Sequence, residues 1–102
     1  MVEFNRNESQ TIGTTAAVVS KETGNNNTYR SSILLINTST GGQQITLAID
    51  GEAAAGAGIV LYPGGHWDDN EGDYYKPTQK VITAISSAAG GKLAIQERVI
   101  SK

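Results

Sequence analysis

The chain has 102 residues and a formal net charge of −2, with eight Lys and Arg scattered along it and no Cys. A chain of this length forms one small domain. Because the basic residues form no run, capture of nucleic acid is not expected, and the lack of Cys excludes disulfides and thiolate metal sites. No stretch is apolar and long enough for a membrane helix or a secretion signal, so we expect a protein made and kept soluble in a cytoplasm.

Aromatic residues make up 6% and charged residues 18% of the chain, whereas Gly, Ser, Thr, Ala, Asn and Ile are plentiful. This composition is typical of short strands and tight turns. Residues 1–10 are polar apart from Val2 and Phe4 and are predicted to form an N-terminal arm. The arm is either a frayed terminus or a segment that orders against a neighbouring subunit, with Phe4 as its anchor. Residues 11–102 are expected to form a single β-sandwich domain.

Turn signals rich in Gly, Asn and Pro divide the rest of the chain into short strand candidates. We expect strands at residues 11–20, 29–37, 44–50, 59–62, 80–86 and 92–100. The second of these is apolar on both faces at its centre and is predicted as a central strand. The third alternates, with Ile45, Leu47 and Ile49 on the face expected to be buried. About seven short strands with no helical period predict an all-β fold, an antiparallel β-sandwich or barrel of the jelly-roll-like kind.

Three connecting segments carry further predictions. Pro63 and Gly64 predict a type II turn, because Pro sets φ at the second position and Gly supplies the positive φ of the third. Residues 51–58 are rich in Gly and Ala and predict a flexible or closely packed loop. In the last strand the apolar parity changes between Glu97 and Ile100, which either a bulge or an edge position near Glu97 would explain.

Residues 59–85 hold the only Trp, the only His and three of the four Tyr, so any specific chemistry is expected there. The acidic loop at 68–73 fails the EF-hand calcium template. Counting from Asp68 places Asp73 at the obligatory Gly position and Gln79 at the position of the bidentate Glu. A solvated acidic loop is the favoured interpretation, and another kind of loop-borne calcium site is the alternative.

The candidates for catalysis are few. His66 is the only imidazole, so a zinc site would need carboxylates for its other protein ligands, and a Ser-His-Asp triad would need an otherwise ordinary Ser. No Gly-x-Ser-x-Gly elbow is present, and no glycine cluster matches a phosphate loop. The sequence therefore predicts a protein that is not an enzyme and has no cofactor and no metal.

The aromatic residues near the Pro-Gly turn support three interpretations. Tyr62, Trp67, Tyr74 and Tyr75 provide large rings with polar tips, which suit a protein interface or a sugar-stacking platform. The same rings also suit the end of a sandwich core, as a cap. Core capping, a protein interface and a glycan site all stay open from the sequence.

The order of strand and turn residues also resembles small β-sandwich domains in virion proteins of tailed bacteriophages. In those domains an arginine-led strand ending in "N-x-S" is followed by an "L-x-P-G-G" turn and an "A-I-S" strand. The resemblance covers residues 29–97, and the first 28 positions carry none of it. The matching positions are Arg30, Ile33 to Ser39, Ile45 to Ala48, Gly58 and Ile59, Leu61, Pro63 to Gly65, Trp67, Ile82, Ala84 to Ser86, and Leu93 to Ile95 with Glu97.

This resemblance implies a capsid decoration (cement) protein on the exterior of a virion, assembled in the host cytoplasm. A chain of 102 residues that opens with Met1 and has no fibre repeat favours the free-standing kind. The implied partners are the major capsid protein at capsomer junctions and further copies of the chain, as a trimer, with no nucleic acid and no membrane. The alternative is a carbohydrate- or receptor-binding module of a phage tail or fibre. The interface residues expected are Phe4, Arg6, Tyr62, His66, Trp67, Tyr74 and Tyr75.

Overall fold

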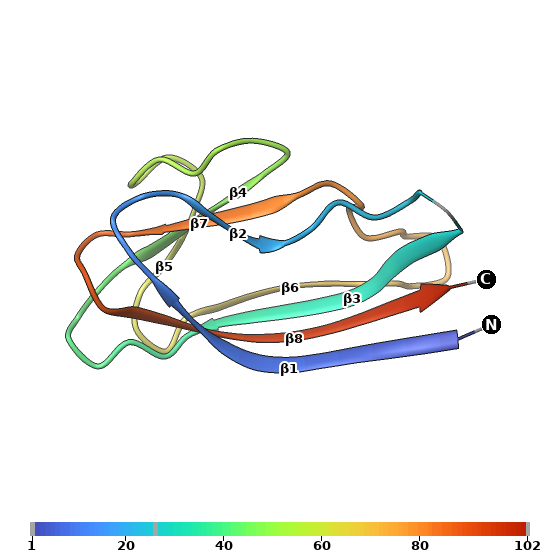
Figure 1. The fold of residues 1–102 in the computed structure, drawn as a ribbon, viewed down its shortest axis with the longest axis horizontal. Helices are drawn as coiled ribbons and strands as arrows, with labels where there is room; N and C mark the ends of the chain where they lie inside the picture. The colour runs from blue at the N-terminus through green and yellow to red at the C-terminus, as the bar shows by residue number, and fades with distance from the viewer. Residues whose placement is uncertain (1, 26, 102) are drawn as a thin grey trace.

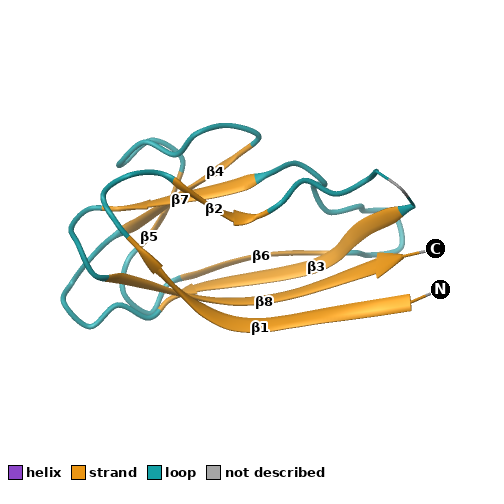
Figure 2. Ribbon diagram, in the orientation of Figure 1, coloured by secondary structure: helices purple, strands orange, loops and turns teal. Residues whose placement is uncertain are grey.

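The computed structural model describes residues 2–25 and 27–101, and these form two antiparallel four-stranded sheets packed face to face (Figures 1 and 2). The first sheet has the strand order β1-β8-β3-β6 and the second the order β2-β7-β4-β5. The strands are β1 (Val2–Ile12), β2 (Ala17–Ser20), β3 (Thr28–Asn37), β4 (Ile45–Ile49), β5 (Ile59–Leu61), β6 (His66–Asn70), β7 (Ile82–Ser86) and β8 (Gly91–Ser101). This arrangement confirms the predicted all-β sandwich. No helix of the described residues is long and apolar enough to cross a membrane.

The hydrophobic core lies between the two sheets, where alternate residues of each strand point inward. The first sheet supplies side chains from β1, β3 and β8, and the second supplies them from the shorter strands β2, β4, β5 and β7. The fully buried members are Ile12, Val19, Ile33, Leu35, Ile45, Leu47, Leu61, Ile82, Ala84, Leu93 and Ile95. The predicted alternation in β4 is correct for Ile45 and Leu47. It is wrong for Ile49, which ends the strand and is 40% exposed.

The segment predicted as an N-terminal arm is a strand. Residues 2–12 form β1 and pair with β8 over their whole length, from Val2 opposite Ser101 to Ile12 opposite Gly91. The strand predicted at 11–20 is therefore divided between the end of β1 and β2. The polar sequence of residues 2–10 does not indicate a strand, because β1 lies at the edge of its sheet and is exposed along most of its length. Such a strand needs few apolar side chains.

The parity change in the last strand arises from a bulge in its neighbour. β8 is a central strand between β1 and β3, so the predicted edge position is wrong. The register between β3 and β8 shifts between Arg30 and Ser32, opposite Val99 and Arg98. The irregularity thus lies near Glu97, as the bulge alternative requires, but the extra residue belongs to β3.

The loop at 51–58 is closely packed at its end. Gly58 has a φ of +138°, and a Cβ atom there would lie 2.5 Å from the carbonyl oxygen of Leu47. Thr46 Oγ1 accepts a hydrogen bond at 3.0 Å from the backbone N–H of Gly56. The backbone of the loop therefore packs so closely against the backbone of β4 that only glycine fits at residue 58.

Candidate functional site

The aromatic residues expected to form one cluster lie at two ends of the molecule. Tyr62 follows β5 at the turn into β6, whereas Tyr74 and Tyr75 lie in the loop that leaves β6. The five residues of β6 separate these groups by about 17 Å at the usual rise of a strand. Tyr62 is 62% exposed and Tyr74 is fully exposed. No single aromatic platform is formed.

Trp67 packs against the core. It lies in β6 opposite Leu35 of β3, and its partly buried ring packs against the core cluster. Core capping, one of the three interpretations of the aromatic residues, is therefore correct for Trp67. The neighbouring His66 lies opposite Ile36 and is exposed to solvent.

Three of the predicted interface residues, Phe4, Tyr74 and Tyr75, lie toward the end of the sandwich where both termini lie (Figure 1). Phe4 lies in β1 and the two Tyr follow β6, and these strands are the two opposite edges of the first sheet. Val2 and Phe4 begin β1 at this end and are exposed, Phe4 by 57%. Tyr74 and Tyr75 reach the same end in the loop after β6, which is tied to β3 by a bond from the Glu71 N–H to the Ser31 carbonyl. We call Val2, Phe4, Tyr74 and Tyr75 the aromatic end.

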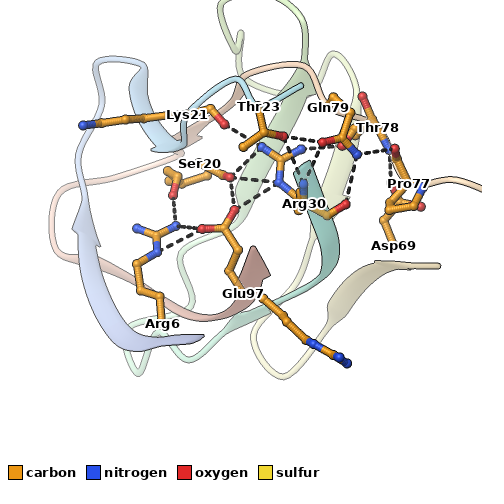
Figure 3. Close-up of polar contacts among 12 residues, drawn as sticks. Arg6, Ser20, Lys21, Thr23, Arg30, Asp69, Pro77, Thr78, Gln79 and Glu97 are labelled. Carbon is orange, nitrogen blue, oxygen red and sulfur yellow. Dashed lines mark hydrogen bonds and ion pairs between the residues drawn. The ribbon is translucent and has the colours of Figure 1, made fainter. Parts of the chain in front are cut away.

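The most extensive polar site is buried and centres on Arg30, which is completely inaccessible to solvent (Figure 3). Its guanidinium donates to Glu97 Oε2 at 3.0 Å and to Ser20 Oγ at 2.7 and 3.1 Å. Ser20 in turn donates to Glu97. The remaining donors of Arg30 reach the backbone carbonyl oxygens of Lys21, Thr78 and Lys80. One side chain therefore joins both sheets and the loop before β7.

Arg6 completes this site from the edge strand β1. Its guanidinium pairs with Glu97 Oε1 at 3.0 Å and donates to the Val19 carbonyl of β2 at 2.6 Å. Glu97 therefore lies between two arginines, as Figure 3 shows, and both of its oxygens are paired. Arg6 is predicted from the sequence as an interface residue, but its main contacts are within the chain. A buried carboxylate held in this way satisfies its charge and its hydrogen-bonding capacity.

The side chain of Gln79 forms hydrogen bonds with the backbone of β3 at the bulge. Its side-chain Oε1 accepts from the Arg30 N–H at 2.7 Å, and its Nε2 donates to the Arg30 carbonyl at 2.9 Å. Thr23 donates its hydroxyl to the same amide oxygen. The amide thus takes the place of a neighbouring strand at the point where the register shifts.

Asn37 holds the predicted Pro-Gly turn in place. Its side-chain amide donates to the carbonyl oxygens of Gln43 and Leu61, both at 2.8 Å. Its backbone carbonyl accepts from the Gly64 N–H at 2.7 Å, within a turn closed by a bond from Gly65 N–H to the Tyr62 carbonyl. Gly64 has a φ of +85°, so the predicted type II turn is confirmed. This turn carries the chain from the second sheet to the first.

The acidic segment after Trp67 is part strand and part loop, and its one buried carboxylate has a structural use. Asp69 accepts from the Tyr75 hydroxyl and, at 2.8 Å, from the Thr78 N–H. The hydrogen bond to Asp69, with some burial and the nearby negative charge, raises the pKa of Tyr75. The described residues include no group of three or more His, Cys, Asp or Glu placed to hold a metal ion.

Only some of the residues that form the buried polar site around Arg30 could be predicted from the sequence. Glu97 lies on the same face of its strand as the buried Leu93 and Ile95, so its carboxylate is expected to be buried. A buried carboxylate needs a cation nearby. Arg30 leads an apolar strand and is that cation. Among the described residues, every buried polar side-chain atom has a hydrogen-bond partner. The interior polar groups therefore hold the architecture together, and the exposed surfaces are where a partner can bind.

No protein-family model matches the chain, and no curated protein matches it. A solved structure described as "Bacillus endospore appendages form a novel family of disulfide-linked pili" is similar in fold, with a TM-score of 0.56 and 19% sequence identity. The match covers 99% of this chain and 88% of that chain. The likeness concerns the fold of the two chains.

Proposed function

We propose that the protein is a non-enzymatic structural subunit that adds to a larger protein assembly. The specific setting we propose is the outer surface of a tailed-phage head, where it acts as a decoration protein and binds the major capsid protein at capsomer junctions. The observation that carries the proposal has two parts: among the described residues every buried polar side-chain atom is hydrogen-bonded, and the aromatic end is left exposed.

The aromatic end has the chemistry of a protein-binding surface. Tyr and Phe provide large contact areas and are common in the residues that contribute most to protein interfaces. Phe4, Tyr74 and Tyr75 are all more than half exposed at one end of the sandwich. A protein that bridges neighbouring subunits stabilises the closed shell by its differential affinity for it, and many copies make weak contacts sufficient.

The resemblance to virion domains supports the setting through residues with defined structural uses. Arg30 and Glu97, which belong to the resembling pattern, form the buried ion pair. Asn37 and the Pro63-Gly64 turn, which also belong to it, are joined by hydrogen bonds. The fold likeness to a chain from disulfide-linked pili supports an assembling subunit in general. The present sequence has no Cys, so a disulfide link is not part of the proposal.

The test is addition of the purified protein to undecorated capsids, followed by sedimentation. We expect the native protein to sediment with the capsids and the variant Phe4→Ser/Tyr74→Ser to bind at least about tenfold more weakly, a loss of about 1.4 kcal/mol. Tyr62→Ser is the matched control because Tyr62 is similarly exposed but lies at the opposite end. Failure of the native protein to bind, or equal loss with Tyr62→Ser, would refute the proposal.

The tail-module alternative predicts glycan binding. It has less support because Trp67, the ring best suited to stacking on a sugar, packs against the core. A glycan array with the native protein distinguishes the two functions. Binding to a defined glycan that Tyr62→Ser abolishes would favour the alternative.

A further inference from the structure

The outer edge of β1 is the longest open edge of the sandwich. β1 pairs with β8 on one side over eleven residues with no register shift, and within the described ranges 2–25 and 27–101 no strand pairs with its other side. The strand contains no Pro and is exposed along most of its length. A long, regular edge of this kind presents unpaired backbone groups ready to bind another strand.

The other edges are shorter or protected. β2 has four residues with a register shift, and its carbonyl groups at Val18 and Val19 accept hydrogen bonds from Gln10 and Arg6. β5 has three residues and β6 has five. β1 is therefore the edge that can form the most backbone hydrogen bonds with a partner strand.

The sequence of β1 is complementary to itself in one antiparallel register. When two copies of β1 align over their full length, Asn7 lies opposite Asn7, and Arg6 of each copy lies opposite Glu8 of the other. Directly opposed side chains share a face of the sheet, where opposite charges attract and like charges repel. The same register places Glu3 opposite Thr11, so no like charges face each other.

Neighbouring registers that keep the same faces lack this property. Centring the pairing on Arg6 places Arg6 opposite itself, and centring it on Glu8 places Glu8 opposite itself. Within one copy Arg6 already forms ion pairs with Glu8 at 2.7 Å and with Glu97 at 3.0 Å. In the Asn7-centred register the Arg6–Glu8 pairs of the two copies combine into four alternating charges, which fixes the register as well as adding attraction.

We propose that β1 is a self-association edge, and that two copies of the protein join there about a two-fold axis centred on Asn7. The pair has one continuous antiparallel sheet of eight strands, and the open edge disappears. This arrangement is a dimer, in place of the trimer that the resemblance to virion domains implies. It does not rest on the proposed capsid function, because it concerns the protein alone in solution.

Disulfide trapping tests the register, because the native sequence has no Cys and each introduced thiol is unique. Asn7→Cys places two thiols directly opposite each other, about 5 Å apart at Cβ, which a disulfide can span after small adjustment. Asn5→Cys and Ser9→Cys are matched controls on the same exposed face. Each of these introduced thiols lies about 14 Å from its own copy in this register, but the thiol at position 5 of one copy faces the thiol at position 9 of the other.

We expect Asn7→Cys to cross-link completely under mild oxidation. Asn5→Cys or Ser9→Cys alone should give little cross-linking, whereas an equal mixture of the two should give the heterodimer. Sedimentation equilibrium of the native protein should show dimers that weaken in about 1 M salt, which screens the charge pairs. A native monomer or trimer would overturn the proposal, as would cross-linking of Asn5→Cys alone equal to that of Asn7→Cys.

Discussion

At the scale of single residues, the structure depends on Arg30, a charged residue at a buried position where an apolar side chain is usual. Arg30 is fully buried, and its planar guanidinium meets Glu97, a hydroxyl and three backbone carbonyl oxygens. Arg suits this position because the donors of its planar guanidinium point in fixed directions. The pair is costly to desolvate, and removing Arg30 would leave Glu97 with only Arg6 and Ser20 as partners.

Arg30→Met is expected to lower the free energy of unfolding by about 3–5 kcal/mol, because Glu97 then loses a buried partner and several carbonyl groups lose their donor. The measurement is denaturant-induced unfolding followed by circular dichroism. Arg98→Met is the control, since Arg98 lies one residue from Glu97 but forms only a half-exposed ion pair with Glu3. That change is expected to cost less than about 1 kcal/mol. Equal losses for the two variants would contradict the assignment.

Tyr75 provides a spectroscopic prediction. Its hydroxyl donates to Asp69, and this bond raises the pKa of Tyr75 above its ordinary value near 10. The bond therefore stabilises the folded protein below about pH 10, and this contribution is lost as the pH rises through the raised pKa. In an ultraviolet titration of tyrosinate, Tyr75→Phe should remove a component that titrates above the ordinary range of tyrosine. Asp69→Asn should return that component to the ordinary range. If the component lost in Tyr75→Phe already titrates in the ordinary range, and Asp69→Asn leaves the titration unchanged, the hydrogen bond is ruled out.

At the scale of elements, the sequence predicts those strands whose inward residues are apolar and fails where a polar residue is buried. β3 and β4 follow from their runs of Ile and Leu. The sequence of β6 instead predicts the start of an acidic loop, because its inward positions are Trp67 and Asp69, and a buried Asp does not match the usual alternation. Whether Asp69 is buried depends on Tyr75 and Thr78, which bind it from the following loop, and single-strand patterns carry no such information.

The candidate site was predictable to a similar extent. Phe4, Tyr74 and Tyr75 are exposed, and their use as interface residues stays a prediction. The burial of Trp67 could not be read from the sequence, because the same aromatic and turn residues suit a core cap and a surface. It is decided by the pairing of β6 with β3, which is a contact between distant segments.

The pairing of β4 with β5 depends on the close approach of Gly58 to Leu47. Gly58→Ala is expected to lower the free energy of unfolding by at least about 2 kcal/mol, because a Cβ atom would lie 2.5 Å from a carbonyl oxygen and φ is +138°. Gly51→Ala is the control, since a Cβ atom at Gly51 has no neighbour within 4 Å. Thermal unfolding of both variants measures the difference. A loss confined to Gly51→Ala would contradict the packing described here.

At the scale of the whole molecule, the two sheets differ in the length of their strands. β1, β3 and β8 have ten or eleven residues, whereas no strand of the second sheet has more than five. The long strands carry both termini to the aromatic end, and the loops before β3 and β7 lie over them there (Figure 1). The result is an elongated subunit with extents of 41 × 22 × 22 Å, with different surfaces at its two ends and an open edge along its side. Val2 and Phe4 belong both to the aromatic end and to the β1 edge, whereas Tyr74 and Tyr75 belong to the aromatic end alone.

Imaging of intact virions that carry an epitope-tagged copy of this chain tests the central proposal most directly. The tag belongs in the loop that holds Gly51, where an added Cβ atom has no neighbour within 4 Å. We expect antibody label over the head shell, repeated at capsomer junctions. Label confined to the tail or its fibres, or virions without label, would contradict the proposal that this protein decorates the capsid.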